Sequence, residues 1–303
     1  MKNSNSSLLK LHNVLLSETT RKKSEVVIVV IAIVSFLIHL LFITLANWGI
    51  INPGKFSELL DNPLVAIYTP FSFILIYEVY LLVYYLPKSI SKYIGKQYEI
   101  ITLIVIRSIF NDLSKLEFTS NWFEDKYDVL FTYDILAAII LFFFIFLFYK
   151  LNQIRAAEPR QPITGSIKRF IKMKNVIATF LVPTFLLLAI YNLVMWINTN
   201  FFVMDGHVDS IKDINKIFFD DFFTVLILTD VILLLTSLLH THQFSTVIRN
   251  SAYIISTILI KMSFGNEGIV GAVLPVVAVG IGVVILLIEN QYRKLDSGLD
   301  NKG

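Results

Sequence analysis

The chain has 303 residues, of which 55% are hydrophobic and 16% are charged, and its formal net charge is +3. Soluble domains carry about 25% charged residues, so a chain this poor in charge and rich in long apolar runs belongs to the integral membrane class. The sequence contains no cysteine, which excludes disulfides, thiolate metal sites and cysteine nucleophiles.

The N-terminal residues 1–24 are rich in Ser, Asn and Lys. We interpret them as a cytoplasmic tail, and the alternative is a short helix on the membrane surface built on the apolar patch 8–16. The apolar run 26–47 that follows is longer than the roughly 7–15 apolar residues of a signal peptide, and no small-residue cleavage site follows it promptly. It therefore predicts a retained first transmembrane helix.

Apolar runs of membrane-spanning length recur along the rest of the chain. Two further runs are less clear, because 98–116 and 247–264 each carry a basic residue within the apolar stretch. Each of these two could be a helix on the membrane surface or a short crossing. The clear runs are 64–86, 129–149, 175–197, 222–239 and 269–288.

The charges of the loops decide between these two interpretations, because cytoplasmic loops are enriched in Lys and Arg. Segment 150–174 holds seven basic residues and one acid, whereas segment 117–128 is acidic. Both loops obey the rule only if 98–116 crosses the membrane, and the same reasoning makes 247–264 cross. The sequence thus predicts an all-α polytopic membrane protein with eight transmembrane helices and both termini cytoplasmic.

The two uncertain segments also resemble each other. When 99–110 is aligned with 253–264, five of twelve positions are identical and the base Arg107 corresponds to Lys261. The order of flanking features is repeated as well, since an Asn-Gln-x-Arg motif follows both the fourth and the eighth predicted span. We therefore predict two tandem four-helix repeats in parallel orientation, because each repeat has an even number of spans.

The predicted domain organisation follows from this duplication. It consists of a cytoplasmic tail 1–24, a first four-helix membrane unit 25–155, a basic cytoplasmic linker 156–174, a second four-helix membrane unit 175–293 and a cytoplasmic tail 294–303.

Four charged residues within the predicted spans are the candidate site residues: Glu78, Arg107, Asp230 and Lys261. A charge in a membrane span costs about 2.5–3.5 kcal/mol, so it is expected to be paired or functional. In each repeat an acid lies on the second span and a base on the third, which predicts the pairs Glu78–Arg107 and Asp230–Lys261. These pairs either only fix the packing of the helices or line and gate a path for ions.

No nucleotide-binding, metalloprotease or hydrolase motif occurs, so we expect no enzyme activity, no cofactor and no metal site. His240 and His242 are two positions apart and do not share a helix face. Gly280 and Gly282 give the last span a small-residue face suited to close packing. The basic segment 150–174 is expected to contact anionic lipid rather than nucleic acid.

The sequence therefore favours a multi-pass protein of the plasma or inner membrane that conducts ions or a small solute, as a channel or a secondary transporter. The alternative is a non-conducting scaffold or accessory subunit whose intramembrane acid–base pairs are structural. A homo-oligomer is compatible with either function.

Overall fold

The structure is a computed structural model, and it describes residues 13–52, 60, 62–113, 116, 126–156, 165–198, 214–238, 244–266 and 268–300. Within these residues every regular element is a helix, as predicted: there are eight long α-helices and one short 3₁₀-helix. Their bounds are α2 Glu18–Asn47, η2 Pro63–Ile67, α4 Tyr68–Tyr85, α5 Ile90–Leu113, α6 Lys126–Ala156, α7 Gly165–Ile197, α8 Ile214–Leu238, α9 Phe244–Phe264 and α10 Ile269–Asp300.

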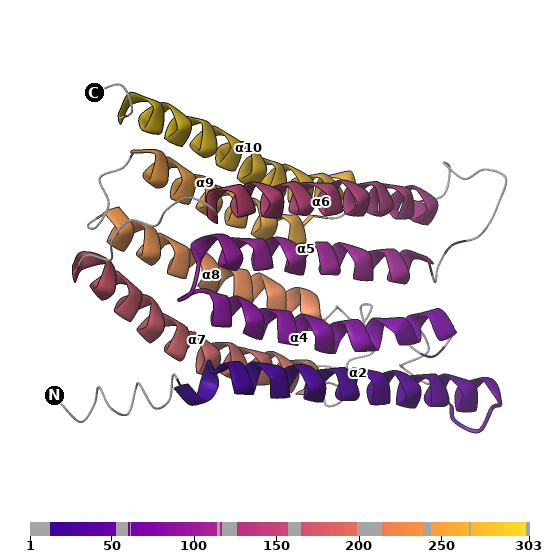
Figure 1. The fold of residues 1–303 in the computed structure, drawn as a ribbon. Helices are drawn as coiled ribbons and strands as arrows, with labels where there is room; N and C mark the ends of the chain where they lie inside the picture. The colour runs from indigo at the N-terminus through magenta and orange to yellow at the C-terminus, as the bar shows by residue number, and fades with distance from the viewer. Residues whose placement is uncertain are drawn as a thin grey trace.

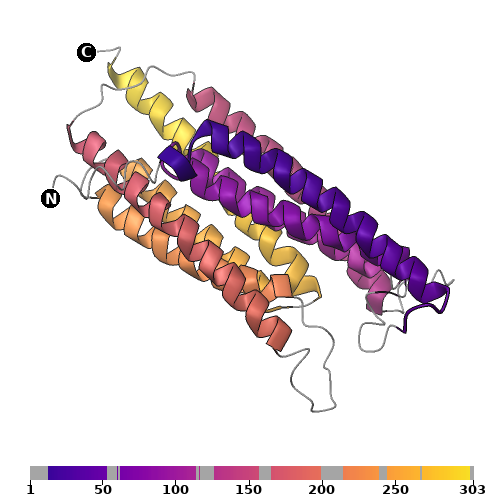
Figure 2. The same cartoon turned by 90° about the horizontal axis from the view of Figure 1, so that it is seen from below.

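The long helices lie side by side, and each runs antiparallel to the next one along the chain (Figure 1). In the first half α2 packs on α4, α4 on α5 and α5 on α6, and the second half repeats this series from α7 to α10. The halves meet mainly where α6 packs on α10. Figure 2 shows α10 passing between the two groups of helices.

Among the described residues, six helical segments are long and apolar enough to cross a membrane: α2, η2 together with α4, and parts of α6, α7, α8 and α10. Large apolar side chains cover the outward faces of these helices, for example Leu37 on α2, Phe143 on α6 and Leu187 on α7. Continuous apolar surface of this kind is unusual on a soluble protein and is expected where helices contact lipid. The fold thus supports the predicted multi-pass membrane class.

The two remaining long helices, α5 and α9, are more polar but similar in length. α5 has 24 residues and is therefore about 36 Å long, enough for a bilayer core of about 30 Å. It lies between α4 and α6 and also touches α9 and α10, so Tyr98, Ile100 and Arg107 are buried. A helix enclosed by protein needs no continuous apolar surface, which explains its composition.

Several helices extend beyond the apolar runs that predicted them. α2 begins at Glu18, ahead of the predicted span 26–47, because the Ser17 hydroxyl caps it by accepting a hydrogen bond of 3.1 Å from the Thr20 backbone amide. α7 begins inside the predicted linker, and α10 continues into the predicted tail. An apolar run marks only the part of a helix that suits lipid, and a helix can continue beyond it into water. The first part of the patch 8–16 and residues 117–125 lie outside the described residues.

Candidate functional site

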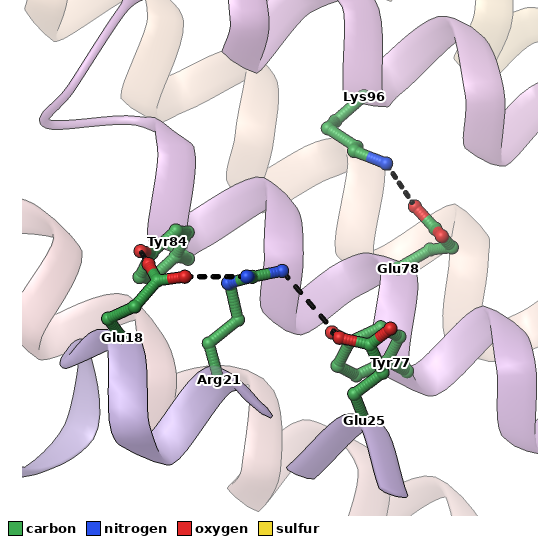
Figure 3. Close-up of polar contacts among 7 residues, drawn as sticks. All are labelled: Glu18, Arg21, Glu25, Tyr77, Glu78, Tyr84 and Lys96. Carbon is green, nitrogen blue, oxygen red and sulfur yellow. Dashed lines mark hydrogen bonds and ion pairs between the residues drawn. The ribbon is translucent and has the colours of Figure 1, made fainter. Parts of the chain in front are cut away.

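Lys96 on α5 lies between two carboxylates. Its Nζ donates a hydrogen bond of 3.2 Å to Glu78 Oε2 on α4 (Figure 3) and another to Glu99, one turn further along α5. The Tyr149 hydroxyl on α6 donates to the other oxygen of Glu99. The three charged side chains are between 14% and 28% exposed, so this cluster is half-buried and has one cation for two acids. We call it the Lys96 cluster.

A glycine makes room for the tyrosine of the Lys96 cluster. A Cβ atom at Gly95 would lie 2.6 Å from the Tyr149 hydroxyl oxygen, which is closer than real Cβ contacts allow. The hydroxyl therefore reaches Glu99 only because position 95 carries no side chain.

A second group of charges joins the start of α2 to α4 (Figure 3). Arg21 lies between two acids, with Nη2 2.6 Å from Glu18 Oε1 and Nη1 3.6 Å from Glu25 Oε2. Tyr84 donates to Glu18, and Tyr77 donates to Glu25 at 3.3 Å. Both acids are at least half exposed, so this group fastens α2 to α4 and does not line an interior path.

Lys88 lies in the turn between α4 and α5 and covers the same end of the bundle. Its Nζ is 3.4 Å from the centroid of the Tyr84 ring, a cation–π distance. Partial burial lowers the pKa of Lys88 below its ordinary value, although the nearby Glu18 carboxylate acts in the opposite direction.

The third cluster is fully buried and joins both halves of the protein. Asp230 on α8 is 6% exposed, and its Oδ2 accepts a hydrogen bond of 3.2 Å from Gln97 Nε2 on α5. Thr257 on α9 contacts both residues, with its Oγ1 2.7 Å from Gln97 Oε1 and 3.3 Å from Asp230 Oδ2. These partners of Asp230 are neutral. We call this group the Asp230 cluster.

A cavity of about 30 Å³ borders Asp230, large enough for about one or two water molecules. The hydroxyl of Tyr93 on α5 is buried close to Asp230 but completes no hydrogen bond of good geometry within the described residues. The remaining residues that line the cavity are mostly apolar: Leu86, Ile90, Ile94, Leu233, Leu234, Asn250, Tyr253 and Ile254.

Arg249 on α9 and Glu289 on α10 form an ion pair with a distance of 2.7 Å between Nη1 and Oε1, and the two side chains are 4% and 1% exposed. The guanidinium also donates through Nε and Nη2 to Asn250 Oδ1, at 3.2 and 3.0 Å. Asn250 in turn donates to Ser237 on α8 at 3.4 Å. This pair is therefore neutralised within the protein.

Tyr98 on α5 links the two halves near the Asp230 cluster. Its hydroxyl oxygen lies 3.1 Å from Ser256 Oγ on α9, and Ser256 donates to the Ala278 carbonyl on α10 at 2.7 Å. A Cβ atom at Gly282 would lie 1.9 Å from the Tyr98 hydroxyl oxygen. The small-residue face predicted for the last span thus receives a tyrosine of the first half.

The predicted pair Glu78–Arg107 is wrong, because Glu78 pairs with Lys96. The prediction placed the start of the third span near residue 98, but α5 begins at Ile90. Lys96 therefore lies at the depth of Glu78. Arg107 is buried eleven residues further along α5, which is about 16 Å along the helix axis.

The predicted pair Asp230–Lys261 is wrong for a related reason. Lys261 Nζ lies 3.8 Å from Asp220, which precedes Asp230 on α8 by ten residues. Both side chains of that pair are partly exposed, at 33% and 48%, whereas Asp230 faces Gln97 and Thr257 in the interior. A lysine can reach toward the end of the bundle and leave the buried acid to neutral partners.

Sequence reasoning missed several members of these clusters. Lys96 lies between the predicted spans 64–86 and 98–116, although an acid three residues later, Glu99, is the spacing of a helical ion pair. Arg249 and Glu289 lie near the ends of their apolar runs, where a charge normally indicates the membrane interface. Only the packing of α9 against α10 buries them.

Comparison of the chain with protein-family models, with curated proteins and with solved structures found no match. The case for a function must therefore come from the buried polar clusters. Among the described residues, no three His, Cys, Asp or Glu side chains converge on a position that could hold a metal ion.

Proposed function

We propose that this protein crosses the membrane eight times and moves a small cation across the bilayer, as a channel or a secondary transporter, with Glu78 and Asp230 on the path. The observation that carries the proposal is the setting of Asp230. Burying a carboxylate is costly unless a cation or a proton neutralises it. The hydrogen-bond partners of Asp230 are neutral, and a cavity lies beside it. It is therefore available to a cation from outside.

The eight crossings are supported by the arrangement of the helices. α5 and α9 run alongside the six apolar segments, and the start of α2 and the end of α10 lie at one end of the bundle (Figure 1). The start of α7, with exposed Lys168, Arg169 and Lys172, lies at that end as well. The positive-inside rule makes it the cytoplasmic end.

The packing is also what two tandem repeats would produce. The neighbours along the chain pack in the same series within each half, and α6 packs on α10, so the fourth helix of one half meets the fourth helix of the other. α5 touches α9 in the same way, third helix to third helix. Two units related by an axis along the membrane normal would meet through such equivalent helices.

A non-conducting scaffold is the second candidate, and the Arg249–Glu289 pair favours it. This pair is buried and matched by further hydrogen bonds, which is the pattern of a structural ion pair. In a scaffold, the Lys96–Glu78 pair would likewise serve only to hold the helices together. The two candidates differ in whether removal of the acids changes ion flux.

The test uses the purified full chain reconstituted in liposomes, with fluxes of H⁺, Na⁺ and K⁺ measured under imposed gradients. We expect Asp230→Asn and Glu78→Gln to lower the flux. Asp221→Asn is a matched control, because it removes the same carboxylate from the same helix at a residue that contacts Asn192 on α7. Absence of flux of any cation through the folded wild-type protein would contradict transport. Unchanged flux with lowered thermal stability in Asp230→Asn would favour the scaffold.

A further inference from the structure

The hydrogen bonds of Thr257 indicate the charge state of its neighbour. Its Oγ1 lies near three acceptors, at 2.7 Å from Gln97 Oε1, 3.0 Å from the Tyr253 carbonyl and 3.3 Å from Asp230 Oδ2. A threonine hydroxyl has one proton to donate. The shortest of these contacts, to Gln97, is the best place for it.

A proton on the aspartate would then satisfy the longer contact between Thr257 and Asp230. An ionised carboxylate only accepts hydrogen bonds, whereas a protonated one can donate. Protonated Asp230 would donate to Thr257 Oγ1, Thr257 would donate to Gln97 Oε1, and Gln97 Nε2 would donate back to Asp230. Each of the three side chains then donates one hydrogen bond and accepts another.

The cavity supplies a route for that proton. It borders both Asp230 and Tyr93, and the buried Tyr93 hydroxyl interacts with Asp230 without completing a hydrogen bond of good geometry to a described residue. Buried hydroxyls that lack a protein partner are commonly satisfied by water. A water in this cavity would accept from Tyr93 and bridge it to Asp230.

The lining of the cavity suits a proton better than a metal cation. Hard metal cations require about six or more oxygen ligands, but most of the lining is aliphatic. The polar atoms of Asn250 are already bonded to Arg249 and Ser237. A proton requires only the one carboxylate.

We infer that Asp230 is a proton-binding site and that water in the adjoining cavity exchanges its proton. Release breaks the O–H bond of the Asp230 carboxyl group and transfers the proton to water, leaving a carboxylate and a hydronium ion, and binding is the reverse. This inference rests on the proposed function and names its cation as H⁺.

The titratable groups that face Asp230 are Tyr93 and Tyr98 from α5 and Tyr253 from α9. The nearest bases are engaged elsewhere, since Lys96 bonds to Glu78 and Glu99, and Arg249 bonds to Glu289. No base among the described residues forms an ion pair with Asp230 in this structure.

Infrared difference spectroscopy on the purified full chain tests the site independently of transport. We expect a carboxylic acid C=O band that titrates with pH, shifts in D₂O and is absent from Asp230→Asn. Asp221→Asn should retain the band, and Tyr93→Phe should retain it at a changed frequency. A band that survives in folded Asp230→Asn, or no titrating band in the wild type, would overturn the assignment. A band insensitive to D₂O would overturn the exchange with cavity water.

Flux measurements separate failure of this inference from failure of the proposed function. In liposomes, Asp230→Asn should lower H⁺ flux by about 100-fold, the range in which single proton-transfer groups contribute, and Tyr93→Phe should lower it less. Flux of Na⁺ or K⁺ without H⁺ would overturn the inference and leave cation transport standing. The expected infrared bands without any flux would leave the site standing and overturn transport. If Asp230→Asn fails to fold, Asp230→Glu is tested in its place. It keeps the carboxyl group and should retain part of the H⁺ flux.

Discussion

Glu78 and Asp230 each lie on the second long helix of their half of the protein, yet their surroundings differ. The Glu78 side chain is 14% exposed and pairs with Lys96. Asp230 is 6% exposed and is held by an amide and a hydroxyl. One acid is thus neutralised by a fixed cation of the protein, and the other is not.

The difference reflects how far each acid lies from water. A lysine near the end of the bundle keeps part of its hydration, so its ion pair with Glu78 carries a modest desolvation penalty. Deep between α5, α8 and α9, a neutral hydrogen-bonded acid avoids the cost of burying two charges. The site of Glu78 therefore holds fixed charges, whereas the neutral partners of Asp230 suit an acid that carries a proton.

The largest expected effect tests whether the burial of an ion pair determines how much stability is lost when one partner is removed. Arg249→Met removes the cation of the most buried pair and leaves the Glu289 carboxylate without it. We expect a loss of about 3–5 kcal/mol in the free energy of unfolding, because removing one partner leaves an uncompensated buried charge. Denaturant unfolding of the purified protein in detergent micelles measures it.

The control for this prediction is the double variant Arg249→Met with Glu289→Gln, which replaces the stranded carboxylate by a neutral amide. It should recover part of the lost stability. A loss below about 1 kcal/mol in Arg249→Met, the usual value for an exposed ion pair, would mean that water reaches this pair.

The contact between the two halves gives the next largest effect. In Gly282→Ala the new methyl group would lie 1.9 Å from the Tyr98 hydroxyl oxygen, so α5 or α10 must shift. We expect a loss of about 1–3 kcal/mol in the free energy of unfolding, as for other overpacked cores. Adding Tyr98→Leu, which shortens the opposing side chain, should recover part of it.

Gly165→Ala is the matched control for Gly282→Ala, because no atom lies within 4 Å of a Cβ at Gly165. It should leave the thermal midpoint unchanged or slightly raised, since alanine favours the helix more than glycine. Equal losses in the two alanine variants would show that the close approach of Tyr98 does not matter.

Lys96→Gln is expected to have a smaller effect than Arg249→Met, because the Lys96–Glu78 pair is more exposed than the Arg249–Glu289 pair. The substitution leaves Glu78 and Glu99 side by side without their shared cation, but both acids are partly exposed, at 14% and 28%. We expect the free energy of unfolding to fall by about 1–2 kcal/mol, in the range for a polar group that loses its partner. Thermal melts in detergent measure it, and adding Glu78→Gln should recover most of it. A loss as large as that of Arg249→Met would contradict the smaller sensitivity expected of the more exposed ion pair.

Much of the fold was predictable from the sequence, because six helical segments carry apolar runs that suit lipid. The helical character of 98–110 and 253–264 was also predictable. Because these segments contain polar residues, only the charges of the loops indicated that they cross the membrane. Crossing by these two helices stays a prediction. The partners of Glu78 and Asp230 were not predictable, because pairing depends on where each helix begins, and α5 begins eight residues before the expected start.

The neutral members of the Asp230 cluster had no signal in the sequence. Gln97 and Thr257 are residue types found on many helix surfaces, and only the packing of α5 and α9 on α8 brings them to the aspartate. Tyr93 likewise was one of 13 tyrosines in the chain, and its role depends on the cavity. A single sequence shows which charges are unusual but not which neutral groups surround them.

The smallest expected effect concerns charges that remain in water. We propose that anionic lipid headgroups contact the exposed side chains of Lys168, Arg169 and Lys172 at the start of α7. Each base near an anionic surface contributes about 1 kcal/mol to such binding, whereas exposed charges away from buried features change folding stability by about 0.5 kcal/mol or less. Replacing all three by Gln should therefore leave the thermal midpoint in neutral-lipid nanodiscs unchanged and reduce the stabilisation gained when phosphatidylglycerol is added. Lys261→Gln removes a base in the last turn of α9, a helix that ends at the opposite end of the bundle from the start of α7 (Figure 1); it is the control and should keep that gain. If the triple variant keeps the full stabilisation by phosphatidylglycerol, these bases contact no anionic lipid. Their remaining role would be to set the orientation of the chain in the membrane.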